Sequence, residues 1–157
     1  MMATPLVVSE VAKSFTMHLR DAVKIAVVEQ VSFSLTAGQC AVLGGPSGAG
    51  KSSILKMLYG NYGVDTGQII GKHRGAFMDI ARASAREVLA VRLETMGYVS
   101  QFLRVVPRVS ALDVVAEPLT LRGEDAAVAR ETAMELLSRL NLPERLSDLP
   151  PATFSGG

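Results

Sequence analysis

The segment Gly45-Pro-Ser-Gly-Ala-Gly-Lys-Ser52 constrains the fold of this chain more than any other feature. It matches the pattern G-x-x-x-x-G-K-[ST], in which a loop wraps a polyphosphate with successive backbone N–H groups. Glycine stands where a Cβ would block the phosphates or where φ must be positive. With this composition, on the order of 0.005 accidental matches are expected in the whole chain. The predicted phosphate-binding residues are Gly45, Pro46, Ser47, Gly48, Ala49, Gly50, Lys51, Ser52 and Ser53.

Two side chains of this loop are expected to act directly on a bound nucleotide. Lys51 would bring its charge to the β and γ phosphates, and the Ser52 hydroxyl would ligate Mg²⁺. A helix that follows the loop directs its positive N-terminal end at the same anion. A glycine-rich turn without a ligand would leave the Gly-Lys-Ser sequence unexplained. The chain has no Asn-Lys-x-Asp motif of the kind that GTP-specific switch proteins use to read the base.

Hydrophobic patterning places the loop between a strand and a helix, which predicts an α/β fold. Short β-branched runs predict strands at 6–8, 23–28, 31–35 and 40–43. The last run is continuously apolar, as expected of a strand covered on both faces of a largely parallel sheet. Further strands are predicted at 68–70 and 97–99. Helices are predicted at 52–59, 84–95 and 124–140. Another helix is predicted with Ser110 as its N-cap, and Pro118 is expected to kink or end it.

Charge and cysteine content exclude several classes of protein. The chain carries 16 Lys and Arg against 15 Asp and Glu, without a block of like charge, so no nucleic-acid partner is expected. No stretch approaches the ~20 apolar residues that span a bilayer, so direct membrane insertion is not expected. The single cysteine, Cys40, excludes an internal disulfide framework and suits a cytoplasmic location.

Three motifs together resemble the ATP-binding-cassette (ABC) ATPases, and they occur in that family's order. The loop and the residues after it resemble the family's Walker A segment, Tyr98-Val-Ser-Gln101 its Q-loop, and Phe154-Ser-Gly-Gly157 the start of its signature. The resemblance implies a P-loop NTPase core with an N-terminal antiparallel β subdomain and the start of a helical subdomain, incomplete at the C-terminus. Residues 1–157 would be the N-terminal portion of one ATP-binding domain, with the β subdomain and core at about 1–101 and the helical subdomain at about 102–157.

The same resemblance implies further site residues, each with a simpler alternative. Gln101 would ligate Mg²⁺ and water, or it is only a polar strand end. Phe15 would stack on adenine, or it is an ordinary core aromatic. The signature residues Ser155, Gly156 and Gly157 would contact ATP held by a second protomer, or they form a flexible tail.

A narrower resemblance points to the ATP-binding proteins of the phosphonate carbon–phosphorus lyase system (PhnL type). It is carried by residues 101–112, by Leu58-Tyr-Gly-Asn-Tyr62 and by Asn141-Leu-Pro-Glu-Arg-Leu146. It implies a cytoplasmic ATPase that binds ATP and Mg²⁺, forms a homodimer or pairs with a related ABC ATPase subunit, and associates with carbon–phosphorus lyase core subunits. Lipoprotein-release and macrolide-export cassettes share Gln-Phe and a later proline. The alternatives are therefore a subunit of a membrane importer or exporter, or a truncated module that binds nucleotide without turnover.

Hydrolysis by this family also needs a Walker B segment, an apolar run followed by Asp-Glu, and a switch histidine. In the family both follow the signature, and they have no counterpart in the 157 residues. His18 and His73 fall outside the expected place and are expected at the surface. We therefore expect no complete catalytic set in this chain and no ATP turnover by it alone.

Overall fold

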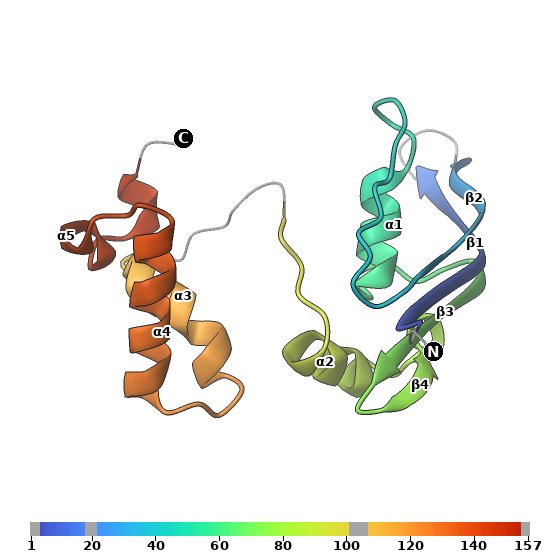
Figure 1. Cartoon of the computed structure of the whole chain (residues 1–157). Helices are drawn as coiled ribbons and strands as arrows, with labels where there is room; N and C mark the ends of the chain where they lie inside the picture. Colours follow the sequence, from blue (N-terminus) through green and yellow to red (C-terminus); the bar gives the residue numbers. More distant parts are fainter. Residues whose placement is uncertain (1–3, 18–21, 101–106, 155–157) are drawn as a thin grey trace. The chain divides into compact units, whose positions relative to one another are not determined.

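The structure, a computed structural model, describes residues 4–17, 22–100 and 107–154 (Figure 1). The chain divides into two compact units, Met1–Met96 and Gly97–Gly157, which are described separately. The predicted functional subdomains, 1–101 and 102–157, stay a prediction.

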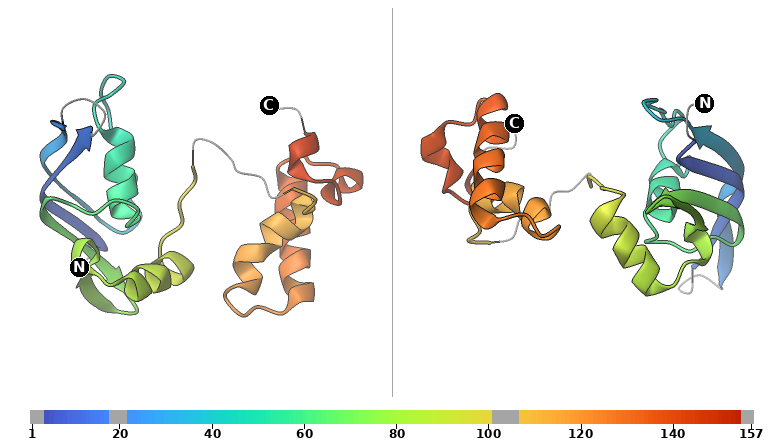
Figure 2. Two further views of the ribbon diagram at one scale, coloured as in Figure 1. Left: turned by 180° about the vertical axis from the view of Figure 1, so that it is seen from behind. Right: turned by 60° about the horizontal axis from the view of Figure 1, so that its bottom comes forward.

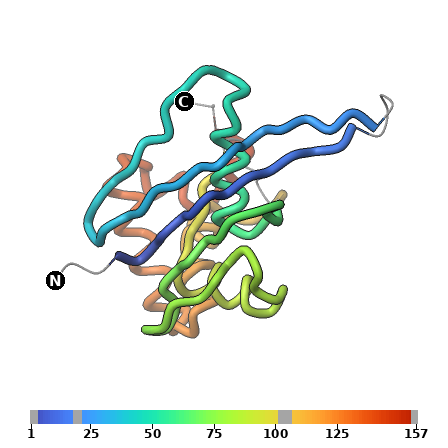
Figure 3. Tube along the Cα trace, turned by 90° about the vertical axis from the view of Figure 1, so that its right-hand side faces the viewer, coloured from blue at the N-terminus to red at the C-terminus, as the bar shows by residue number. Residues whose placement is uncertain are grey.

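A four-stranded antiparallel sheet dominates the first unit, with strand order β2-β1-β3-β4. Its strands are β1 (Leu6–Met17), β2 (Val23–Leu35), β3 (Thr66–His73) and β4 (Ala76–Asp79). Strands β1 and β2 run side by side over their length (Figure 3). The strands predicted at 23–28 and 31–35 are one strand, which passes through Gln30 at a positive φ of 49°. The predicted antiparallel β subdomain is confirmed.

The core of this unit lies between the sheet and α1 (Lys51–Leu58), which covers one face of the sheet (Figure 2). Ile54 and Met57 are the buried positions of α1, and the spacing of three residues puts both on one side of the helix. They pack against apolar side chains of the sheet and of the short 3-10 helix η1 (Ile80–Arg82), namely Leu6, Val8, Val11, Val28, Ile69 and Ile80. This packing fixes the helix that carries the phosphate loop.

Two predicted strands are absent from the described residues. Residues 40–43 form no strand, although they are continuously apolar, and Val42 is 87% exposed. Residues 97–99 form no strand either, and Val99 is 90% exposed. An extended segment becomes a strand only when a neighbour accepts its backbone hydrogen bonds. In the described part of the chain no strand lies beside either segment, so apolar composition alone did not produce one.

The predicted helix at 84–95 is confirmed as α2 (Ala85–Glu94), and its start is set by a capping box. The Ser84 hydroxyl accepts a hydrogen bond from Glu87 N, and the Glu87 carboxylate accepts from Ser84 N at 2.7 Å. The Ser84 hydroxyl also donates to the Glu87 carboxylate at 2.7 Å, and this bond, together with the one from Ser84 N, lowers the pKa of Glu87. The cap satisfies backbone N–H groups that otherwise have no partner at a helix start.

Replacing Ser84 by alanine should destabilise α2 without changing the sheet. Loss of an N-cap side chain costs about 1 kcal/mol, which is about a fivefold change in a local opening equilibrium. Amide hydrogen exchange in α2 should therefore accelerate about fivefold. The matched control is Arg86→Ala, an exposed position of the same helix, which should leave exchange unchanged. Equal protection in both variants would contradict the capping role.

The second unit consists of short helices around a small apolar core. It contains α3 (Ala111–Thr120), α4 (Ala126–Arg139), α5 (Glu144–Ser147) and the 3-10 helix η2 (Pro151–Thr153). The core joins α3 to α4 through the buried residues Leu112, Ala116, Ala129, Ala133 and Leu137.

The start of α3 follows its sequence signal, whereas its end does not. The predicted cap at Ser110 is confirmed, since its hydroxyl accepts from Asp113 N at 3.0 Å. Pro118 does not end α3, which continues to Thr120. In the part of the chain that the structure describes, no helix is both long and apolar enough to cross a membrane.

Candidate nucleotide-binding site

The predicted phosphate loop is an exposed turn that leads directly into α1. Residues 44–49 are exposed, whereas Gly50 is buried and forms the N-cap of the helix. Gly45, Gly48 and Gly50 have positive φ values of 131°, 84° and 77°. Ile54 N donates to the Gly50 carbonyl at 3.0 Å, which closes the first turn of α1. The predicted helix at 52–59 is thereby confirmed, and it begins where a phosphate-binding loop requires it.

Lys51 folds back over the loop that precedes it. Its Nζ donates hydrogen bonds to the Gly45 carbonyl at 2.9 Å and to the Pro46 carbonyl at 2.6 Å. The side chain thus spans the loop and holds its ammonium group inside the loop's curve. A cation held at the loop in this way is suited to bind the oxygens of a polyphosphate.

The start of α1 adds to this positive environment. The first N–H groups of a helix have no intrahelical partner and carry the positive end of the helix dipole. The first turn of α1 contains no acidic residue that would oppose an anion. Ser52 is exposed beside Lys51, and its hydroxyl is a hard oxygen ligand of the kind that Mg²⁺ accepts when it arrives on phosphate oxygens. The residues present therefore fit MgATP at the loop.

Among the described residues, no group of three or more His, Cys, Asp or Glu side chains could hold a metal ion by itself. His73 is half-buried and its Nδ1 lies 2.6 Å from the Thr95 hydroxyl oxygen. Cys40 is exposed and free.

The predicted adenine platform, Phe15, is a half-buried residue near the end of β1. Its ring meets the Tyr62 ring edge to face, with centroids 5.2 Å apart and planes at 72°. Lys13 Nζ lies over the Phe15 ring, 5.5 Å from its centroid, within the range of a cation–π contact. Its predicted role in stacking on adenine stays a prediction.

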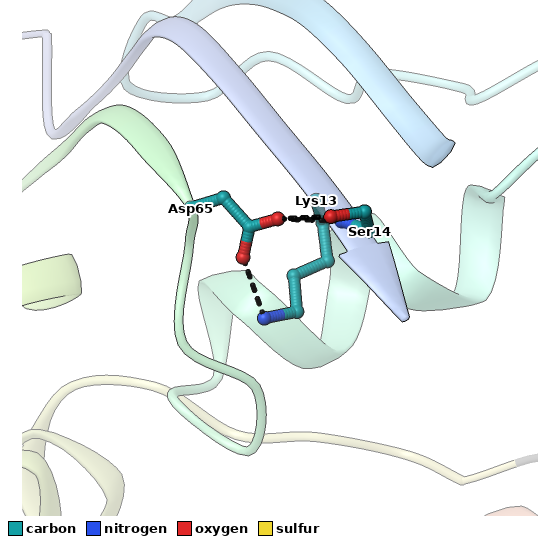
Figure 4. Close-up of polar contacts among 3 residues, drawn as sticks. All are labelled: Lys13, Ser14 and Asp65. Atoms are coloured by element: carbon teal, nitrogen blue, oxygen red, sulfur yellow. Dashed lines mark hydrogen bonds and ion pairs between the residues drawn. The ribbon is translucent and has the colours of Figure 1, made fainter. Parts of the chain in front are cut away.

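The structure also shows a cluster around Phe15 that sequence reasoning missed. Asp65 lies in the turn before β3 and contacts the two residues that precede Phe15, Lys13 and Ser14 (Figure 4). In the sequence, Asp65 was visible only as part of the turn signal Asp-Thr-Gly. Its partners are about fifty positions away along the chain, so no local pattern could have revealed them.

The remaining predicted site residues cannot be placed. Gln101 and the signature residues Ser155, Gly156 and Gly157 lie outside the described residues. The part of the predicted site that the structure brings together is the phosphate loop and the first turn of α1.

Comparison with known proteins identifies the family. A family model described as "ABC transporter" matches residues 28–157. The lipoprotein-releasing system ATP-binding protein LolD of Novosphingobium aromaticivorans is 35% identical over 157 residues, which cover 99% of this chain and 66% of that protein. LolD 2 of Caulobacter vibrioides is 37% identical over 137 residues, which cover 87% of this chain and 58% of that protein. The chain thus spans less than two thirds of the length of either relative.

Solved structures confirm the fold. A dimeric post-hydrolysis state of the ATP-binding cassette MJ0796, bound to ADP and Pi, superposes with a TM-score of 0.82 at 23% identity, and covers 96% of this chain and 63% of that one. The named relatives support the transporter alternative and give no support to the phosphonate carbon–phosphorus lyase role or to lyase subunits as partners. The match over 28–157, together with the phosphate loop at the head of α1, shows that the chain belongs to the ABC transporter family and carries part of its ATPase domain.

Proposed function

We propose that this chain binds MgATP through residues 45–53 as part of the ATP-binding subunit of a membrane ABC transporter of the lipoprotein-releasing type. The observation that carries nucleotide binding is Lys51, whose Nζ is held over the loop by the Gly45 and Pro46 carbonyls. The transporter type rests on the names of relatives that are 35% and 37% identical.

In this proposal Lys51 and the loop amides hold the β and γ phosphates and stabilise the charge that spreads over the transferred phosphoryl group. Mg²⁺, carried by the phosphates and ligated by Ser52 and Gln101, would neutralise further charge. Phe15 would stack on the adenine ring. Hydrolysis would require a head-to-tail dimer, in which Ser155, Gly156 and Gly157 of one protomer contact ATP on the other.

We place the subunit in the cytoplasm, attached to the membrane through a permease partner. A second candidate, the phosphonate carbon–phosphorus lyase system, rests on the resemblance of residues 101–112 and of the segments around Tyr62 and Asn141. The two functions differ in their partners, which makes co-purification the decisive experiment.

The partner test uses the tagged chain expressed in its own host and purified in a mild detergent with ATP. Mass spectrometry should identify an integral membrane permease in amounts comparable with the bait. The Lys51→Ala variant, which should not hold the nucleotide-bound dimer, is the matched control. Recovery of carbon–phosphorus lyase subunits without a permease would overturn the transporter assignment.

The third possibility, a module that binds nucleotide without turnover, is tested on the purified 157-residue chain. We expect ATP binding without phosphate release above background, since the chain lacks a Walker B segment and a switch histidine. Turnover that disappears in Lys51→Ala would show that these 157 residues hold a complete catalytic set.

A further inference from the structure

Asp65 joins the segment between α1 and β3 to β1, the strand that carries Phe15. It lies after α1, in the turn that leads to β3, and its backbone N donates to the Ala12 carbonyl at 2.9 Å. Its carboxylate then accepts from Lys13 Nζ at 3.0 Å, from Ser14 N at 2.8 Å, and from the Ser14 hydroxyl (Figure 4). One residue therefore holds three consecutive positions of β1.

This contact lies where β1 loses its neighbour on one edge. The pairing of β1 with β3 runs from Leu6 to Ala12, whose partner is Thr66, the first residue of β3. Beyond Ala12, β1 is paired with β2 as far as Met17. An unpaired strand edge has N–H groups that need a partner. The Asp65 carboxylate supplies one to Ser14 N and so extends the restraint of β3 toward Phe15.

The restraint is ionic as well as geometric. Hydrogen bonds from Ser14 and Lys13 hold the pKa of Asp65 well below its usual range, so the carboxylate stays charged throughout the ordinary pH range. Lys13 is 18% exposed at its side chain, and the ion pair fixes its Nζ over the Phe15 ring. With Lys13 held in this way and Tyr62 against the ring, Phe15 is restrained both along its backbone and at its ring.

The same part of β1 is connected to the phosphate loop through β2. Val28 of β2 is the register partner of Lys13, and a Cβ built on Gly50 would lie 3.0 Å from Val28 Cγ2. Val28 therefore approaches Gly50 of the loop and is the neighbour of Lys13, which stands two residues before Phe15. A shift of β1 at this point would change where the Phe15 ring stands relative to phosphates held at the loop.

We propose that Asp65 is a positioning residue for nucleotide binding, which sets the Phe15 ring at the place where the base stacks by clamping Lys13 and Ser14. This inference rests on the proposed stacking role of Phe15. Asp65 itself touches neither base nor phosphate in this proposal. Its effect should therefore appear only with ligands that have a base.

The test compares MgATP with magnesium tripolyphosphate, which has the phosphates without a base, by isothermal titration calorimetry on the whole chain. Base stacking on an aromatic ring is commonly worth about a tenfold change in affinity, so Phe15→Ala should weaken ATP about tenfold and leave tripolyphosphate unchanged. Asp65→Ala should weaken ATP by about threefold to tenfold, again without affecting tripolyphosphate. In the double variant the Asp65 effect should vanish, because there is no ring left to position.

Asp79→Ala is the matched control, because Asp79 also holds a turn in this unit. Its carboxylate accepts from Ile69 N at 3.2 Å and from Ala81 N at 3.0 Å, and pairs with Arg82. This variant should leave the ratio of the two affinities unchanged. If Asp65→Ala unfolds the chain, Asp65→Asn, which keeps the side chain's size and one acceptor oxygen, gives the same comparison with a smaller loss.

Three results would overturn the inference, and they differ from one another. Equal weakening of both ligands by Asp65→Ala would show a general structural role. Loss of ATP affinity in Phe15→Ala but not in the Asp65 variants would support base stacking on Phe15 and would contradict a positioning role of Asp65. An unchanged ATP affinity in Phe15→Ala would reject the stacking role of Phe15, and the inference with it, while the phosphate loop would still be tested by Lys51.

Discussion

Replacing Lys51 by alanine should lower the affinity for MgATP by about 10- to 100-fold. Hydrogen bonds that involve a charged group contribute about 1.5–3 kcal/mol, and Lys51 is the residue that reaches back over the loop to the Gly45 and Pro46 carbonyls. Its removal takes away the cation that binds the phosphates, together with the two hydrogen bonds that link the side chain to the loop. Isothermal titration calorimetry with MgATP and with magnesium tripolyphosphate measures the loss, which should be similar for both ligands.

Two further variants separate charge from shape. Lys51→Met keeps most of the side-chain length without the charge, so it should lose nearly as much affinity as alanine. Lys72→Ala removes the same charge from an exposed position of β3 and should bind MgATP like the unchanged chain. The phosphate-loop assignment would be wrong if Lys51→Ala bound both ligands with unaltered affinity.

The parts of the site that could be predicted are those whose cause is local in sequence. The glycines of the loop, the helix that starts at Lys51 and the cap at Ser110 each depend on residues within a few positions. Backbone conformation and capping act over this range, so a single sequence reveals them. The antiparallel β subdomain followed by helices came from the family resemblance, and the fold comparison confirms it.

The parts that could not be predicted depend on partners far along the chain. Residues 40–43 have the composition of a buried strand, yet their pairing depends on a neighbour that the described chain does not place beside them. The Asp65 clamp joins positions 51 and 52 residues apart. The narrower assignment to the phosphonate carbon–phosphorus lyase system finds no support among the named relatives for a different reason, because related cassettes share the short motifs on which it rested.

Among the glycines of the site, Gly50 is the one whose replacement by alanine should cost the most stability and MgATP affinity. A Cβ at this position would lie 2.4 Å from the Val27 carbonyl oxygen, and the backbone stands at a φ of 77°. The left-handed conformation costs about 1–2 kcal/mol for a residue with a Cβ, and overpacking adds about 1–3 kcal/mol. The start of α1 must then move away from β2, so we expect a lower unfolding temperature and loss of most MgATP affinity.

Two neighbouring glycines serve as controls, because a methyl group added there would not clash with another atom. A Cβ on Gly44 or on Gly48 would have no other atom within 4 Å, and only Gly48 has a positive φ, of 84°. Gly44→Ala should therefore unfold at the same temperature as the unchanged chain. Gly48→Ala should lose only the stability that a left-handed backbone costs a residue with a Cβ, about 1–2 kcal/mol. Equal unfolding temperatures for Gly50→Ala and Gly44→Ala would contradict this prediction. They would show that the position of α1 and its phosphate loop against the sheet does not depend on the close approach of Gly50 to Val27.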